Sequence, residues 1–227
     1  LATVAVAIAA ADEAITAGVP GVLGIHIEGP FLAQARRGIH RSDKLRGMRD
    51  QDIALLTSLK HGRTLVTLAP EAASPAQIAR LVEAGVVVAL GHSQADYDSA
   101  RAAFAAGATG VTHLFNAMSG FGHRAPGLVG AALENDAVYA GVIADGHHLH
   151  PAALTVALKA KGSEKIMLVT DAMPSVGSDT SGFDLQGRRI RLAEGMLTDE
   201  TGTLAGSHLT MAGAVGNVIA QTSATMA

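Results

Sequence analysis

Four side chains of the sequence are of the types that bind a catalytic metal ion and move protons beside it. Glu28, His92 and His113 supply one carboxylate and two imidazoles, a ligand set of catalytic zinc or iron that leaves positions open for water and substrate. Asp171 is the candidate acid/base, because an aspartate beside a metal can take a proton from water and return it to a leaving amine. A single buried His or Glu is more often structural, and an isolated Asp often caps a turn. The positions of all four residues in the predicted fold therefore decide between a metal site and purely structural roles.

Each of these residues follows a short apolar run, and the runs alternate with segments of helical pattern. Strands are predicted at 21–27, 64–68, 86–90, 110–113, 138–144 and 166–170. Helices are predicted at 50–60, 75–84, 93–106 (with Ser93 as the N-cap) and 151–160, and a helical pattern returns within 204–219. The apolar run 1–11 is predicted to be the middle of a buried helix.

This alternation implies parallel strands with right-handed crossovers, as in a doubly wound sheet or a (β/α)₈ barrel. A doubly wound sheet gathers functional residues at one switch point. In a barrel, by contrast, several strands contribute at their carboxyl ends. Five of the predicted strands end in Glu, His or Asp, which favours the barrel. Only six strands are visible, so two more strands are expected for a complete barrel, and 183–199 is predicted to be a β-hairpin insertion.

Composition excludes several functional classes. The 227 residues carry a formal net charge of −3, which argues against a nucleic-acid partner. The absence of cysteine rules out disulfides, thiolate nucleophiles and cysteine-based zinc sites. No signal peptide or membrane segment is predicted, because the apolar start is short and has no basic flank. We expect a cytoplasmic protein.

Six motifs resemble one enzyme family. They are 24–31 (GIHIEGPF), 91–93 (GHS), 112–133 (THLFNAMSGFGHRAPGLVGAAL), 144–148 (ADGHH), 168–172 (LVTDA) and 202–211 (GTLAGSHLTM). In this order they are similar to the N-acetylglucosamine-6-phosphate deacetylase family of the amidohydrolase superfamily. The resemblance implies an α/β fold, a (β/α)₈ TIM-type barrel of the metal-dependent hydrolase kind. Residues 1–227 would form one incomplete barrel domain, roughly strands 3 to 8, with the family's small β-sandwich domain largely missing.

The resemblance also implies a role for individual residues. Glu28, His92 and His113 match the metal ligands, Asp171 the catalytic aspartate, and His40 a catalytic histidine near the acetyl carbonyl. The positions that match substrate-binding residues are Ile39, Asn116, Ala117, Arg124, Asp145, His148, Leu204, Ala205 and Gly206. Arg124 and His148 would hold the sugar phosphate, one set reaching across a homodimer interface. A guanidinium suits that task because it stays charged and offers a fork of donors.

The implied reaction is metal-dependent removal of the N-acetyl group of N-acetylglucosamine 6-phosphate in amino-sugar catabolism and recycling. One divalent metal is expected, zinc first, with iron, manganese and cobalt also compatible with the ligands. A second metal stays an open question. A dihydroorotase- or allantoinase-like enzyme is one rival, but it would need a bridging carbamylated lysine, and no lysine stands at a suitable strand end. A non-catalytic sugar-phosphate-binding remnant is the other rival.

Overall fold

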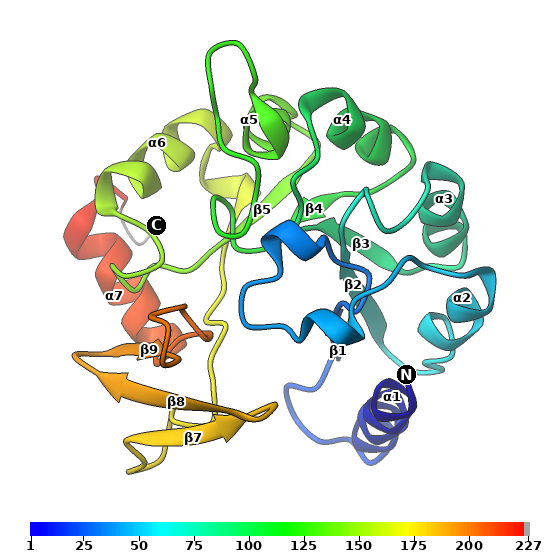
Figure 1. Ribbon diagram of the computed structural model, residues 1–227, viewed down its shortest axis with the longest axis horizontal. Helices are drawn as coiled ribbons and strands as arrows, with labels where there is room; N and C mark the ends of the chain where they lie inside the picture. Colours follow the sequence, from blue (N-terminus) through cyan, green and yellow to red (C-terminus); the bar gives the residue numbers. More distant parts are fainter. Residues whose placement is uncertain (225–227) are drawn as a thin grey trace.

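Six short parallel strands form the centre of the computed structural model, which describes residues 1–224 (Figure 1). The strands are β1 (Gly24–Glu28), β2 (Arg63–Leu68), β3 (Val87–Leu90), β4 (Gly110–Val111), β5 (Tyr139–Val142) and β6 (Ile166–Leu168). Their order in the sheet is the order in the sequence, and every neighbouring pair is parallel. A doubly wound sheet would reverse direction at a switch point. The sequential order and the curl of the sheet instead make this a partial (β/α)₈-type barrel.

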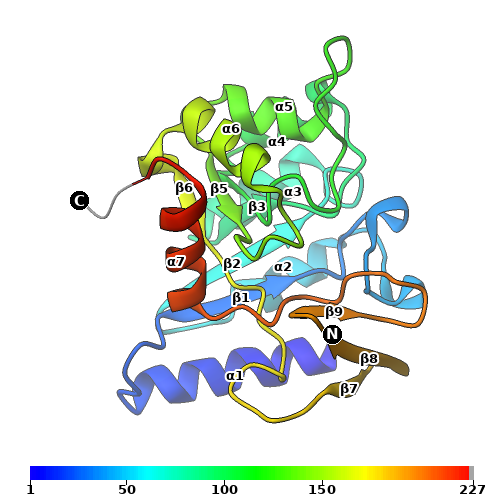
Figure 2. The ribbon, with the colours of Figure 1, turned by 90° about the vertical axis from the view of Figure 1, so that its left-hand side faces the viewer.

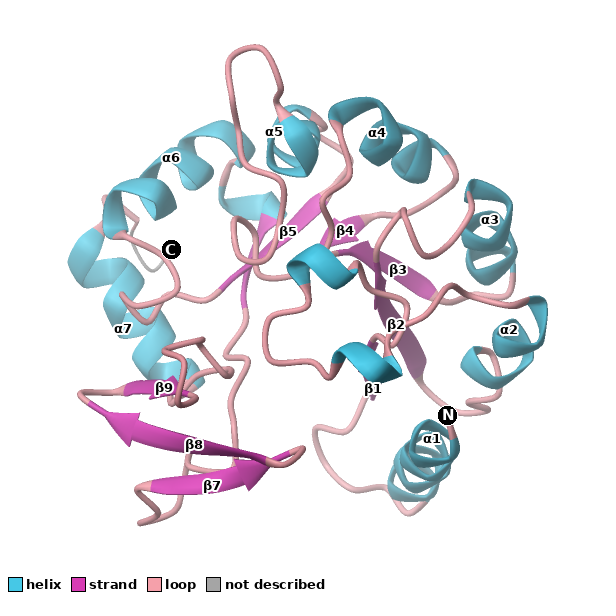
Figure 3. Cartoon of the chain, in the orientation of Figure 1, coloured by secondary structure: helices cyan, strands magenta, loops and turns pink. Residues whose placement is uncertain are grey.

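Helices cover the outer side of the curled sheet (Figure 3). They are α1 (Ala2–Thr16), α2 (Asp50–Leu56), α3 (Pro75–Glu83), α4 (Tyr97–Ala105), α5 (Gly127–Glu134), α6 (Pro151–Lys161) and α7 (Met211–Gln221). Three short 3₁₀ helices lie in the loops, η1 (Gln34–Arg36), η2 (Ser42–Lys44) and η3 (Ser163–Lys165). Local signals begin several of these helices. Ser74 and Gln77 form a capping box at the start of α3, with Pro75 as the first helical residue. His150 accepts the N–H of Ala152 at the start of α6. No described helix is long and apolar enough to cross a membrane.

The main core lies between the strands and the outer helices. Val66, Leu68, Val88 and Leu90 are fully buried there, as is Ile78 of α3. Strands that are covered on the helical side by such aliphatic residues need no aromatic filling, which agrees with the aromatic content of 3%. The strands are thus anchored by a buried core, and the loops at their carboxyl ends start from it.

A second, antiparallel sheet covers the range predicted to be a hairpin insertion. It consists of β7 (Gly182–Leu185), β8 (Arg188–Ala193) and β9 (Met196–Thr198). Gln186 and Gly187 connect β7 to β8 with φ angles of 51° and 82°, as in a type I′ turn. In Figures 1 and 2 this sheet lies on the open side of the curl, near the N-terminus of α1.

Two sequence-based expectations about elements were wrong, and one helix was missed. The helix α1 forms, but Ile8 is its only buried residue, since it packs on one edge of the sheet rather than inside a core. Asp96, not Ser93, caps α4 by accepting the N–H of Ser99 at 2.8 Å. The helical pattern expected after the Gly-Ser-His segment is confirmed as α7, which begins at Met211 after a Thr210 cap. The helix α5 was not predicted, because its start lies in a glycine-rich stretch.

Candidate active site

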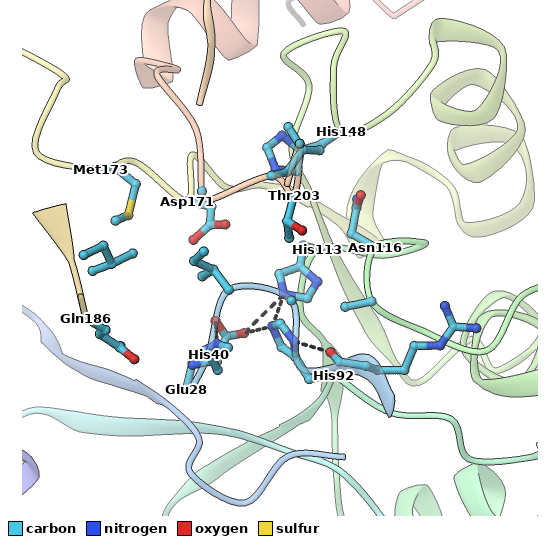
Figure 4. A pocket seen from close by; sticks show the side chains of 18 of the residues that line it. Glu28, His40, His92, His113, Asn116, His148, Asp171, Met173, Gln186 and Thr203 are labelled. Carbon is cyan, nitrogen blue, oxygen red and sulfur yellow. Dashed lines mark hydrogen bonds and ion pairs between the residues drawn. The ribbon is translucent and has the colours of Figure 1, made fainter. Parts of the chain in front are cut away.

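The predicted metal ligands and acid/base come from the carboxyl ends of four strands. Glu28 is the last residue of β1, and His92 and His113 each lie two residues beyond β3 and β4. Asp171 lies three residues beyond β6. Figure 4 shows their side chains turned toward one cavity. The curl of the sheet therefore brings together residues that are up to 143 positions apart in the sequence (171 minus 28).

Three candidate ligand atoms lie close together. Oε1 of Glu28 is 3.4 Å from Nε2 of His92 and 3.3 Å from Nε2 of His113, and the two Nε2 atoms are 3.0 Å apart. Nδ1 of His92 is 2.8 Å from the carbonyl oxygen of Arg36, which can only accept. Nδ1 must therefore carry the proton, and this leaves the Nε2 lone pair of His92 free to bind a cation.

These residues fit a divalent cation. Ligands about 2.0–2.1 Å from a tetrahedral ion lie about 3.3 Å from one another, close to the distances between the three atoms. Oε1 of Glu28 and Nδ1 of His113 are buried without a hydrogen-bond partner, and a cation would supply the missing partner of the carboxylate. His40 extends the set, because Glu28, His40 and His92 also offer ligand atoms within 4.8 Å of one another. Its Nε2 lies 3.6 Å from Oε2 of Glu28.

Burial and charge set the ionisation of the site. Burial alone would raise the pKa of Glu28, but the imidazoles of His113, His40 and His92 hold it well below its ordinary value. Burial opposes protonation of His113, yet the Glu28 carboxylate raises its pKa overall. The pKa of Asp171 is raised, first by burial and then by the nearby charge of Glu28. The lowered pKa favours the anionic form of Glu28, while Asp171 has the raised pKa that suits a proton carrier.

The backbone is strained at three of these four residues. His92, His113 and Asp171 have φ angles of 47°, 31° and 50°, in the left-handed region that side chains rarely adopt. Such residues cluster at functional sites and persist only where the surroundings enforce them. Gly91 shows how tight the surroundings are, because a Cβ there would lie 2.4 Å from Cγ2 of Thr112.

A cavity of about 650 Å³ opens at these residues. Besides Glu28, His92, His113 and Asp171, it is lined by several predicted substrate contacts, namely Ile39, His40, Asn116, Ala117, His148, Leu204 and Gly206. Gly206 (φ 63°) lies against the Asp171 backbone, where a Cβ would be 2.8 Å from the Asp171 carbonyl oxygen. The segment around Leu204 thus forms one wall of the cavity directly over the candidate acid/base.

Three predicted substrate residues lie outside this cavity. Arg124 is exposed on the loop before α5 and borders a separate cavity of about 510 Å³. Ala205 is fully buried in a small cluster with Ile190 and Leu197. Asp145 lies behind His148, with Oδ2 2.7 Å from Nδ1 of that ring, so it orients a cavity residue instead of lining the cavity itself.

The cavity also has lining residues that sequence reasoning missed, among them Arg36, Met173, Gln186 and Thr203. Gln186 belongs to the β7–β8 turn, and Figure 4 shows its side chain on the same side of the cavity as His40. Gly187 signals a turn, but no local signal indicates that the turn reaches the site. An enzyme with a carbamylated lysine would require a lysine in this cavity. Within the described residues, no lysine lines it.

Together, the barrel-type sheet and the strand-end His, Glu and Asp residues define the class of metal-dependent barrel hydrolases. The model of the Amidohydrolase family matches residues 1–223, and the chain belongs to that family.

Its relatives in this family carry two related names. The chain is 49% identical to an N-acetylgalactosamine-6-phosphate deacetylase of Shewanella sp. (strain ANA-3), over 91% of this chain and 53% of the relative. It is 38% identical to an N-acetylglucosamine-6-phosphate deacetylase of Vibrio furnissii, over 88% of this chain and 51% of the relative. The chain thus spans about half the length of the curated relatives it matches.

A solved structure agrees with these likenesses. The crystal structure of N-acetylglucosamine-6-phosphate deacetylase from Pasteurella multocida superposes with a TM-score of 0.89 at 37% identity. The match covers 94% of this chain and 56% of that one. The partial barrel is therefore the shared fold of the matched region.

Proposed function

We propose that this chain carries most of the active site of a metal-dependent deacetylase. The reaction is hydrolysis of the N-acetyl group of N-acetylglucosamine 6-phosphate, giving glucosamine 6-phosphate and acetate, in amino-sugar catabolism and recycling. The observation that carries the proposal is the meeting of Glu28, His92 and His113 beside Asp171, with His148 on the wall of the same cavity. A structure with N-acetyl-D-glucosamine-6-phosphate bound exists for a relative from Mycobacterium smegmatis, 35% identical to this chain.

Glu28, His92 and His113 would hold the metal, with zinc expected and iron, manganese and cobalt as alternatives. A divalent cation there would supply electrophilic activation of the acetyl carbonyl and make water nucleophilic at neutral pH. His40 could bind either a second ion or the substrate, and the number of metal ions bound per chain distinguishes the two roles. We assign it to the substrate, where its imidazole donates a hydrogen bond to the acetyl oxygen.

Asp171 carries the proton in this mechanism. It accepts a proton from the attacking water, and the carbonyl carbon becomes tetrahedral. It then donates that proton to the amine nitrogen, the C–N bond breaks, and acetate leaves. The raised pKa of Asp171 supports this role, because burial and the charge of Glu28 make the carboxylate a better base.

The phosphate would bind at the end of the cavity that His148 and Asn116 line, with the neighbouring Ala117 backbone. Arg124 does not line this cavity, and it is exposed in the segment before α5, which forms a loop that projects from the fold (Figure 1). We therefore propose a homodimer in which Arg124 of one copy completes the phosphate site of the other. A cytoplasmic location fits a cysteine-free chain that acts on a sugar phosphate.

The chain matches about half the length of its relatives, so we also propose how its strands correspond to a complete barrel. The six strands would be strands 3 to 8 of an eight-stranded barrel, and the small β-sandwich domain would lie outside the chain.

A second candidate substrate is N-acetylgalactosamine 6-phosphate, the C4 epimer. It is favoured by the higher identity to the Shewanella relative, 49% against 38% for the Vibrio relative. Both sugars present the same acetamide and phosphate groups, so the residues assigned above serve either one.

The test is steady-state kinetics of acetate release from both sugar phosphates, with metal content measured on the same preparation. We expect one bound divalent ion and a higher kcat/KM for one epimer. A metal-loaded protein that releases acetate from neither sugar would overturn the function, and a preference for the galacto sugar would select the second candidate.

A further inference from the structure

Glu71 connects the end of β2 to the turn that carries His92. Its Oε2 accepts the hydroxyl proton of Ser93 at 2.7 Å, and its Oε1 accepts the backbone N–H of Gln94 at 2.6 Å. Both carboxylate oxygens are therefore used on the two residues that directly follow His92. Glu71 does not line the 650 Å³ cavity, so it has no direct contact with a bound substrate.

We infer that Glu71 is a positioning residue that holds the metal ligand His92, through Ser93 and Gln94, in its strained conformation. The inference rests on the metal site of the proposed function. It assigns to Glu71 a role in metal affinity that does not depend on touching the ion.

The strain at His92 is what makes such a residue necessary. A φ of 47° at a non-glycine residue costs free energy, so it persists only where the surroundings enforce it. The ring is held from one side by the Arg36 carbonyl, and the His92 carbonyl accepts the N–H of Ala33 at 2.9 Å. These contacts fix the ring and one end of the residue, while Glu71 fixes the chain that follows it.

Ser93 passes this constraint on to the next strand end. It is fully buried, and its hydroxyl oxygen also accepts the N–H of Ala95 at 2.9 Å. Its own N–H donates to the Ala117 carbonyl at 3.0 Å, and its carbonyl accepts the N–H of Ser119 at 3.0 Å. The Glu71 carboxylate thus braces two segments at once, the one with His92 and the one with the predicted substrate residue Ala117.

Replacement of Glu71 leaves the ligand atoms in place but removes the brace. Outer partners of metal ligands typically contribute roughly 10- to 100-fold to metal affinity. In Glu71→Ala the Gln94 N–H and the Ser93 hydroxyl lose their acceptor. In Glu71→Gln one carboxamide oxygen can still accept from one of the two donors, so an intermediate effect is expected.

The experiment measures zinc and cobalt dissociation constants by competition with a chromophoric chelator, together with the visible spectrum of the cobalt-loaded protein. The variants are Glu71→Ala, Glu71→Gln and, as a matched control, Glu83→Ala at the exposed end of α3. We expect metal affinity to fall roughly 10- to 100-fold in Glu71→Ala and less in Glu71→Gln, with a changed cobalt spectrum in both. Glu83→Ala should match the parent.

Parental metal affinity and an unchanged cobalt spectrum in Glu71→Ala would overturn the inference. If Glu71→Ala does not fold, parental metal affinity and an unchanged cobalt spectrum in Glu71→Gln would overturn the inference. A parent protein that binds metal but hydrolyses neither sugar phosphate refutes the proposed function while the affinity comparison still tests Glu71. A parent that binds no divalent ion refutes the metal site, and the inference with it.

Discussion

Asp145 holds His148 in one orientation. Its Oδ2 lies 2.7 Å from Nδ1 of the ring, and its Oδ1 accepts the backbone N–H groups of His147 and His148 at 2.9 and 2.8 Å. Both side chains of the pair are only 7% exposed. Burial would raise the pKa of Asp145, but its hydrogen bonds to His148 hold it below its ordinary value. The anion therefore keeps the proton on Nδ1, and Nε2 is left to face the cavity.

This pair predicts a defect in phosphate binding when the carboxylate is neutralised. In Asp145→Asn the amide weakens the hold on the ring, and KM for the phosphorylated sugar should rise about tenfold while kcat changes little, because binding that is equal in ground and transition states affects KM alone. The control is N-acetylglucosamine without phosphate, which parent and variant should hydrolyse equally. Equal losses on both sugars would contradict the assignment.

Removal of the acid/base should have the opposite kinetic signature. Asp171→Asn cannot take a proton from water, so kcat should fall by roughly 100- to 10,000-fold. Metal content should stay at the parental level, because Asp171 is not among the assigned ligands. Metal analysis and single-turnover acetate release measure the two quantities, and full activity in this variant would refute the role.

Chelation should destabilise the protein. A ligand that binds only the folded state at 100 times its Kd stabilises by about 2.7 kcal/mol, which corresponds to about 5–10 °C in Tm for a chain of this size. We expect Tm to fall by that amount on treatment with a chelator and to recover with added zinc. A double variant, Glu28→Gln with His113→Gln, should show no such response, and a full chelator effect in it would place the ion elsewhere.

The ion pair between the partly exposed Arg46 and the buried Asp52 predicts a pH-dependent contribution to stability. Asp52 is 1% exposed and accepts two bonds from Arg46 and one from the Arg49 N–H, which lower its pKa below the ordinary value of 3.8. Because the pKa is lower in the folded state, the stabilisation is complete above pH 3.8 and is lost as pH falls through the folded-state pKa. Asp52→Asn should therefore lower the free energy of unfolding by about 2 kcal/mol at pH 7, because it weakens the charged hydrogen bonds while Arg46 stays partly solvated.

Urea unfolding at several pH values checks this prediction. The gap between parent and Asp52→Asn should narrow only below pH 3.8, the ordinary value of the aspartate. The exposed pair of Arg41 and Asp43 provides the control, because its side chains are 45% and 52% exposed and Asp43→Asn should change little. A constant gap down to the lowest pH at which the protein folds would argue against the ion pair.

Much of the fold and of the site could be predicted because both depend on local pattern. Each strand is a short apolar run, and its polar end residue marks the functional edge, so Glu28, His92, His113 and Asp171 could be grouped before any contact was known. The exposure of α1 could not be predicted, because an apolar helix carries no sign of how much of its surface its neighbours cover. The helix α5 was missed because glycine and alanine give little periodicity, although six of its residues are buried.

The remaining site residues depend on tertiary placement. Gln186 reaches the cavity from a separate antiparallel sheet. Its neighbours in the sequence give no indication that this sheet packs beside the cavity. Arg124 matches a phosphate-binding position by motif, yet its loop leads away from the cavity of the same chain. The sequence identifies the guanidinium, while in the proposed homodimer its use would depend on where the other copy of the chain lies.

The sequential strand order has a consequence for how the site fails. His92 and His113 follow neighbouring strands, so their relative position depends on one strand pair. Glu28 and Asp171 follow the first and last strands of the sheet, and their separation depends on the curvature accumulated over all six. A perturbation that flattens the sheet slightly would move the proton carrier away from the carboxylate while leaving the two imidazoles together. In the proposed mechanism, proton transfer would thus be the step most sensitive to the overall bend of the protein.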